Sequence, residues 1–140
     1  NYSIVSGMPP DINLLNEKNN GENVLKLIQN NLVLSCHDIS SGGLIVALAE
    51  MAISTNLGIK IPKPKKLTNI YEYFFCEDQS RYVLEVDPIS LTKTEKILKD
   101  NNIYFENIGF TQNDLFEIEG ELKINVKELS KINNEWYNKY

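Results

Sequence analysis

Two short stretches of this sequence carry most of the side chains that could bind a ligand or move a proton. The first is HDISSGG at residues 37–43, and the second is EDQSR at residues 77–81. We call residues 38–43 the glycine turn and residues 77–81 the acidic turn. The candidate site residues are His37, Asp38, Ser40, Ser41, Gly42, Gly43, Glu77, Asp78, Gln79 and Arg81.

The glycine turn lies between a strand pattern and a helix pattern, and Asp38, Ser40 and Ser41 are candidate N-caps. The first turn of a helix leaves backbone N–H groups without partners, and glycine brings no Cβ to block them. Together with the helix dipole this suits a phosphate. The run matches neither the Walker pattern nor G-x-G-x-x-G. A glycine pair can equally allow close helix packing, so both interpretations stay open.

His37 is the only histidine and follows Cys36 directly. It could serve as a base, a phosphate donor or a metal ligand, but a histidine at a strand end is more often a hydrogen-bonded structural residue. Asp38 is likewise more often a cap than a magnesium ligand. Neighbours on a strand point to opposite faces, so we expect no Cys–His pair. Cys36 and Cys76 are expected to be free thiols in a reducing compartment.

The acidic turn combines two carboxylates, an amide, a hydroxyl and a guanidinium. Such a group could bind Mg²⁺-phosphate or a sugar, with the carboxylates on the metal and Arg81 on the anion. A surface turn with internal pairing would have the same composition. Both interpretations stay open here too.

Composition narrows the class of protein. The chain has 140 residues, which suits one domain, and a net charge of -5 with a pI near 4.9. Nucleic-acid binders usually carry a basic footprint, so we expect no nucleic-acid partner. There is neither a long apolar run nor a signal peptide, so we expect no membrane span and a cytoplasmic location. The missing initial Met suggests a fragment of a longer protein.

The pattern of apolar residues predicts a mixed α/β domain, with helices packed on a β-sheet. Helices are expected over 11–31 (broken at Gly21), 44–54, 67–75, 91–100 and 127–139. Strands are expected over 1–9, 31–37, 57–61, 81–86, 103–110, 115–118 and 122–126. The helix over 44–54 is apolar nearly all round, which predicts that it is buried.

Three stretches resemble the phosphoribosylformylglycinamidine synthase family. Residues 36–52 resemble its HDxSxGGLxxALAEMA run, and residues 75–83 resemble its F-x-E-x-Q-x-R-[FY]-V run. Residues 124–129, with Trp136 behind them, are similar to its last strand and helix. The sequence departs from the family at Ser41, where many relatives carry an acidic residue, and at Asp78, where Ser is more usual.

The resemblance implies an aminoimidazole ribonucleotide synthetase-like C-terminal domain over residues 1–140, from the second half of a multidomain ligase of purine biosynthesis. That ligase uses ATP, Mg²⁺ and glutamine-derived ammonia to convert formylglycinamide ribonucleotide to the amidine. Its implied partners are the remaining synthase domains, a glutaminase component and a nucleotide substrate. The candidate residues are then site-lining by analogy and none is catalytic or a metal ligand, so we expect the isolated domain to be inactive.

Two other classes stay open. One is a related enzyme that shares Gly-Gly-Leu after a strand: aminoimidazole ribonucleotide synthetase, selenophosphate synthetase, a hydrogenase-maturation protein or thiamine monophosphate kinase. The other is a non-catalytic structural or binding module, in which the glycine pair serves packing and the acidic turn is only a surface turn.

Overall fold

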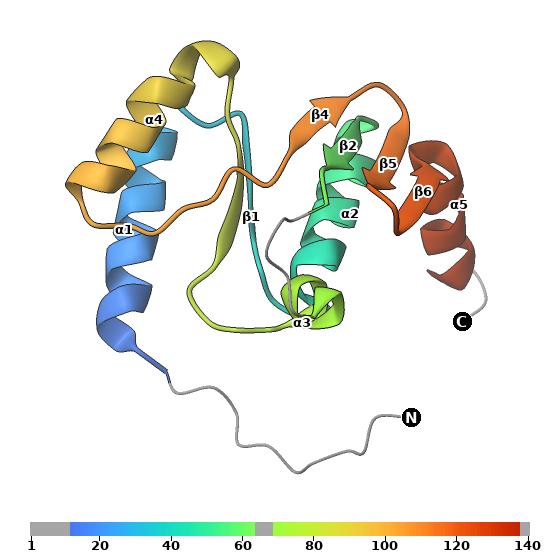
Figure 1. Ribbon diagram of the computed structural model, residues 1–140, viewed down its shortest axis with the longest axis horizontal. Coiled ribbons are helices and arrows are strands. Elements are labelled where there is room, and N and C mark those ends of the chain that lie inside the picture. Colours follow the sequence, from blue (N-terminus) through green and yellow to red (C-terminus); the bar gives the residue numbers. More distant parts are fainter. Residues whose placement is uncertain (1–11, 64–68, 138–140) are drawn as a thin grey trace.

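The computed structural model describes residues 12–63 and 69–137, so the strand predicted over 1–9 lies outside the described residues. The mixed α/β arrangement confirms the predicted fold class (Figure 1). The helices are α1 (Leu14–Gln29), α2 (Gly43–Thr55), α3 (Ile70–Phe75), α4 (Pro88–Asp100) and α5 (Val126–Tyr137). The strands are β1 (Ser35–Asp38), β2 (Gly58–Ile61), β3 (Tyr82–Glu85), β4 (Phe110–Gln112), β5 (Leu115–Ile118) and β6 (Leu122–Asn125).

The described strands form two sheets. β1 and β3 make an antiparallel pair in which Asp38 lies opposite Tyr82. The other four strands have the order β4-β2-β5-β6. β2 and β5 run parallel while the remaining pairs are antiparallel, so this sheet is mixed, as predicted. The predicted hairpin between β5 and β6 is present, and Gly120 takes a left-handed φ of 81° in its turn.

β3 contributes to two hydrophobic cores because successive residues of a strand point to opposite faces. Val83 belongs to the larger core, which joins α2, α3 and α5 to the four-stranded sheet around Phe116. Leu84 packs against the smaller core, in which Leu27 of α1 lies with Leu98 of α4. Figure 1 shows the result: α1 and α4 lie together on one side, and α2 with the four-stranded sheet lies on the other.

Helix α2 is buried along one face, while Val46, Glu50 and Ser54 on the opposite face are exposed, so the predicted burial is confirmed only in part. Its buried residues are Gly43, Leu44, Ala47, Leu48 and Ala52. It packs against α3, α5 and both sheets. The glycine turn at its start is therefore anchored by the largest core of the domain.

Helix α1 is continuous through Gly21, so the predicted break there is wrong. A glycine in a helix interior costs about 1 kcal/mol relative to alanine, and a helix with a buried face tolerates that. The side chain of Asn13 caps the start by accepting two backbone N–H groups of the first turn. Asn31, with φ 55°, follows the helix end. This left-handed residue delays the strand that was predicted from residue 31, which begins only at Ser35.

The strand predicted over residues 103–110 is wrong except at its last residue. β4 covers Phe110–Gln112. Upstream of it, Ile103 and Phe105 alternate as in a strand, but they do so because their side chains pack on the smaller core. Helix α4 begins earlier than predicted because Asp87 caps it and Pro88 occupies its first turn.

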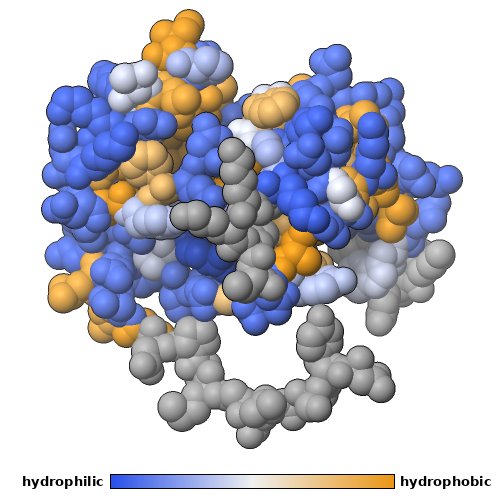
Figure 2. Space-filling model, in the orientation of Figure 1, coloured by the Kyte–Doolittle hydropathy of each residue, from blue (hydrophilic) through white to orange (hydrophobic). Residues whose placement is uncertain are grey.

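Hydrophilic residues cover most of the face drawn in Figure 2, and hydrophobic residues reach the surface in separate patches. Strongly exposed apolar side chains include Leu14, Leu15, Ile89 and Trp136. None of the helices in the described ranges is both long and apolar enough to cross a membrane.

Candidate functional site

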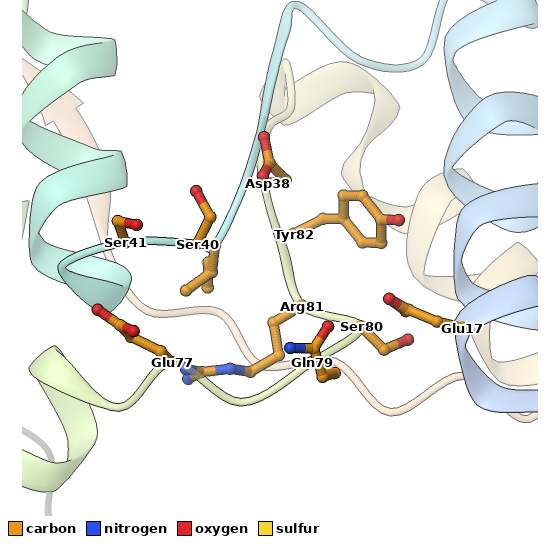
Figure 3. A pocket seen from close by; sticks show the side chains of 10 residues that line it. Glu17, Asp38, Ser40, Ser41, Glu77, Gln79, Ser80, Arg81 and Tyr82 are labelled. Atoms are coloured by element: carbon orange, nitrogen blue, oxygen red, sulfur yellow. The ribbon is translucent and has the colours of Figure 1, made fainter. Parts of the chain in front are cut away.

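A polar pocket of about 360 Å³ lies where the glycine turn meets the acidic turn (Figure 3). Its lining among the described residues is Glu17, Asp38, Ile39, Ser40, Ser41, Glu77, Gln79, Ser80, Arg81 and Tyr82. The two stretches singled out in the sequence therefore share one pocket. Six of the ten predicted site residues line it: Asp38, Ser40, Ser41, Glu77, Gln79 and Arg81.

Two hydrogen bonds join the glycine turn to the acidic turn. The backbone N–H of Ile39 donates to the carbonyl oxygen of Arg81 at 2.9 Å, which extends the β1–β3 pairing by one step. The backbone N–H of Gly42 donates to Oε1 of Glu77 at 2.7 Å. Strand pairing and a charged side chain thus fix the two turns against each other.

Gly42 is the residue before helix α2, and as a glycine it has no side chain of its own with which to cap this helix end. The expectation that Asp38, Ser40 or Ser41 is the N-cap is therefore wrong. The turn passes through left-handed φ values of 83° at Gly42 and 71° at Gly43, which side chains rarely adopt. Because the helix begins at Gly43, its N-cap position is Gly42 and not the aspartate or either serine.

Gly43 brings α2 against the backbone of α3. A Cβ atom at this position would lie 2.7 Å from the carbonyl oxygen of Phe74 and 2.8 Å from Cα of Phe75. The same glycine donates its N–H to the carbonyl oxygen of Ser40 at 3.0 Å. Close packing is thus a sufficient reason for a glycine here.

The two glycine amides are occupied within the protein, at Gly42 by the Glu77 carboxylate and at Gly43 by the turn itself. A carboxylate is the kind of group that a helix N-terminus attracts, so Glu77 takes the place that an anionic ligand would fill. An anion could reach the amide of Gly42 only by displacing Glu77.

His37 lies outside the pocket lining that the described residues make, as do Gly42, Gly43 and Asp78. Its Nε2 lies 3.0 Å from Oε2 of Glu50 on α2, and its Nδ1 lies 2.6 Å from the carbonyl oxygen of Asp38. The ring is therefore engaged on both sides. This arrangement is the hydrogen-bonded structural role that the sequence favoured.

The side chain of Arg81 forms its hydrogen bonds within its own segment of the chain. Its Nη2 donates to the carbonyl oxygen of Cys76, and its Nε lies 3.4 Å from the carbonyl oxygen of Asp78. These contacts are the internal pairing that the sequence left open as an alternative to ligand binding. A ligand in the pocket would therefore find only some of the guanidinium N–H groups available for hydrogen bonds.

Four further residues complete the pocket, and none of them was among the predicted site residues: Glu17, Ile39, Ser80 and Tyr82. Oε2 of Glu17 is buried and has no hydrogen-bond partner among the described residues. Burial, and after it the charge of Glu17, raises the pKa of Tyr82, so its hydroxyl keeps its proton. The alternating pattern of the predicted 81–86 strand could have placed Tyr82 on the same face as Leu84. No local sequence signal, however, indicated that α1 packs beside this face.

The pocket holds more negative than positive groups: carboxylates at Glu17, Asp38 and Glu77 against the guanidinium of Arg81. No cluster of three or more His, Cys, Asp or Glu that could hold a metal ion occurs within 12–63 and 69–137. The pocket therefore presents mainly hydrogen-bond acceptors and hydroxyl groups to a ligand, and only one cationic side chain.

The cysteines are free, as predicted. Burial, and after it the charge of Asp38, raises the pKa of the Cys36 thiol. A hydrogen bond to Asp78, followed by burial, raises the pKa of the Cys76 thiol. Raised pKa values keep both sulfurs protonated, which is the reverse of what a nucleophilic cysteine needs.

The sequence is similar to known proteins over nearly its whole length. Residues 6–118 match the family described as AIR synthase related protein, C-terminal domain. A relative from Pelagibacter ubique, phosphoribosylformylglycinamidine synthase subunit PurL, is 41% identical over 135 residues. The PurL subunit of Bartonella bacilliformis is 34% identical over 141 residues. These matches cover 96% and 99% of the chain but only 18% and 19% of the relatives.

Solved structures show the same fold. Thermotoga maritima PurL complexed with FGAR superposes with a TM-score of 0.70 at 18% sequence identity, and PurL complexed with ATP superposes with a TM-score of 0.69. Each match covers 81% of this chain and 21% of the solved one. The chain thus spans about one fifth of the length of the proteins that it resembles.

Proposed function

Since the chain belongs to the family of AIR synthase-related C-terminal domains, we propose that it serves as such a domain in the second half of a phosphoribosylformylglycinamidine synthase. Sequence identity of 34% to 41% with PurL subunits, over nearly the whole chain, supports this assignment. On this proposal residues 1–140 form one domain of a longer cytoplasmic synthase.

The proposed reaction is the ATP-dependent ligation of ammonia, derived from glutamine, to formylglycinamide ribonucleotide. The proposed partners are the remaining synthase domains, a glutaminase component and the nucleotide substrate. The domain by itself is proposed to be inactive, because amidation needs a positioned substrate, a γ-phosphate and an ammonia route together. The purified chain, supplied with ATP, Mg²⁺, ammonium and formylglycinamide ribonucleotide, should form no amidine, and measurable turnover would contradict this.

We propose that the pocket between the glycine turn and the acidic turn forms one wall of a nucleotide site that other domains complete. The observation that carries this is the meeting of the two turns in one polar pocket. The hydroxyls of Ser40 and Ser41 and the amide of Gln79 are the groups offered to a phosphate or a ribose. The described residues do not fit a Mg²⁺ site, so the proposal leaves the metal ligands to other domains.

Neutralising Glu77 tests the pocket. Glu77→Gln keeps the shape and an acceptor for Gly42 but removes one negative charge. If the pocket takes phosphate, Mg·ADP measured by calorimetry should bind about five- to tenfold more tightly to Glu77→Gln than to the parent chain. Glu128→Gln, an exposed carboxylate on α5, is the matched control and should leave the affinity unchanged.

The competing function is a purely structural module. The close approach of Gly43 to α3 and the occupied amide of Gly42 favour it. Under this alternative neither the parent chain nor Glu77→Gln binds Mg·ADP. Weaker binding by Glu77→Gln would instead indicate a ligand that donates hydrogen bonds to the carboxylate.

A further inference from the structure

Asn20 reaches from helix α1 to the acidic turn. Its Nδ2 donates to the carbonyl oxygen of Ser80 at 2.9 Å and to Oγ of the same residue at 2.9 Å. Both contacts are partly buried. The side-chain amide of Asn20 thus binds both the backbone and the side chain of Ser80, which lies on a different segment.

Ser80 has a φ of 66°, in the left-handed region. Non-glycine residues rarely take this conformation, and serine has no side-chain amide or carboxylate with which to stabilise it locally. A donor shared between the carbonyl and the hydroxyl of one residue restrains both ψ and χ1. The restraint that the serine lacks by itself therefore comes from Asn20.

Ser80 separates Gln79 from Arg81, and all three line the pocket. The backbone conformation at Ser80 decides how its two neighbours leave the turn. We propose that Asn20 is a positioning residue that holds Ser80 in the left-handed conformation and so aims Gln79 and Arg81 at the pocket. That a nucleotide uses the pocket rests on the function proposed above. The positioning of Gln79 and Arg81 by Asn20 does not depend on that function.

The residue after Asn20 supports this role for α1. A Cβ atom on Gly21 would lie 3.5 Å from the hydroxyl oxygen of Tyr82, another pocket residue. Helix α1 therefore comes close to the pocket at the Asn20–Gly21 step. The Asn-Gly pair resembles a helix break in the sequence, but it is the place where α1 meets the site.

A double-mutant cycle in urea denaturation tests the proposal. Asn20→Ala should lower the folding equilibrium constant about five- to tenfold. Ser80→Gly should change the constant by about twofold or less in the parent chain. The loss of the hydroxyl contact with Asn20 offsets the gain from placing glycine at a left-handed φ. In the Asn20→Ala background the same change should raise the folding equilibrium constant about three- to fivefold. There is then no hydroxyl contact to lose, so the only effect is that glycine adopts the left-handed conformation without strain.

Amide chemical shifts give the second measurement. Asn20→Ala should move the Gln79 and Arg81 amide signals, and adding Ser80→Gly should return them towards their parent positions. Asn16→Ala, an exposed asparagine on the same helix, should leave them in place. Leu98→Val lowers stability in the smaller core and should also leave them in place. Equal effects of Ser80→Gly in both backgrounds, or unmoved signals in Asn20→Ala, would overturn the proposal whether or not Mg·ADP binds.

Discussion

Oε1 of Glu77 lies 2.7 Å from the backbone nitrogen of Gly42. Helix α2 thus receives at its start a carboxylate from a segment far along the chain, where a local N-cap would ordinarily stand. The contact stabilises the helix end and ties the acidic turn to the most buried helix of the domain.

Removing this carboxylate should destabilise the protein. Glu77→Ala is expected to lower the free energy of unfolding by about 1 kcal/mol, because a charged acceptor is lost from an exposed helix end. Urea denaturation measures the change. Glu135→Ala, which removes an exposed carboxylate near the end of α5, should change stability by about 0.5 kcal/mol or less. Equal effects of the two substitutions would contradict the capping role.

Gly21 and Gly43 both lie in helices, yet they should respond in opposite ways to alanine. Gly21→Ala should stabilise the chain by about 0.5–1 kcal/mol, since the site is helical and the new Cβ would meet only the Tyr82 hydroxyl, at 3.5 Å. Gly43→Ala should destabilise it by about 2 kcal/mol or more, because φ is 71° and the Cβ would lie 2.7 Å from a backbone oxygen. Thermal and urea unfolding of both variants would decide the matter.

Tyr73 should make stability fall in alkaline solution. Burial, then the charge and hydrogen bond of Glu106, raise its pKa to about 12, above the ordinary value of about 10. Through this interval the unfolded chain loses a proton that the folded chain keeps, so the unfolded state binds fewer protons and stability declines as pH rises. Tyr73→Phe should show a shallower decline than the parent chain on the same pH series. Identical declines would argue against a raised pKa.

Asp78 should control the reactivity of Cys76. Its hydrogen bond is the largest cause of the raised pKa of this thiol. In a Cys36→Ser background, Asp78→Asn should speed alkylation of Cys76 by iodoacetamide about two- to fivefold at mildly alkaline pH, because more thiolate is present. An unchanged rate would show that burial alone keeps the sulfur protonated.

Local sequence signals predicted the elements whose patterns are strong. The apolar run that became α2 and the hairpin of β5 and β6 were placed within a residue or two. The errors at Gly21 and over residues 103–110 share a cause. In both places tertiary packing overrode local propensity, since α1 and the segment around Phe105 bury side chains in the smaller core.

The candidate site was predictable as far as its motifs extend. The glycine turn and the acidic turn were each singled out in the sequence, and residues of both line one pocket. Glu17 was not predictable, because nothing in its neighbourhood marks α1 as a wall of the pocket. The occupation of the Gly42 amide by Glu77 was not predictable either, since it depends on how closely two distant turns approach.

The position of β2 has a consequence for synthesis on the ribosome. β2 covers Gly58–Ile61, but the strands on both its flanks, β4 and β5, are translated only at residues 110–118. During translation Ile61, which is buried in the finished domain, has neither neighbouring strand to cover it. The nascent chain must therefore carry an unfinished sheet until residues 110–118 emerge, and this interval is when chaperones would have most to protect.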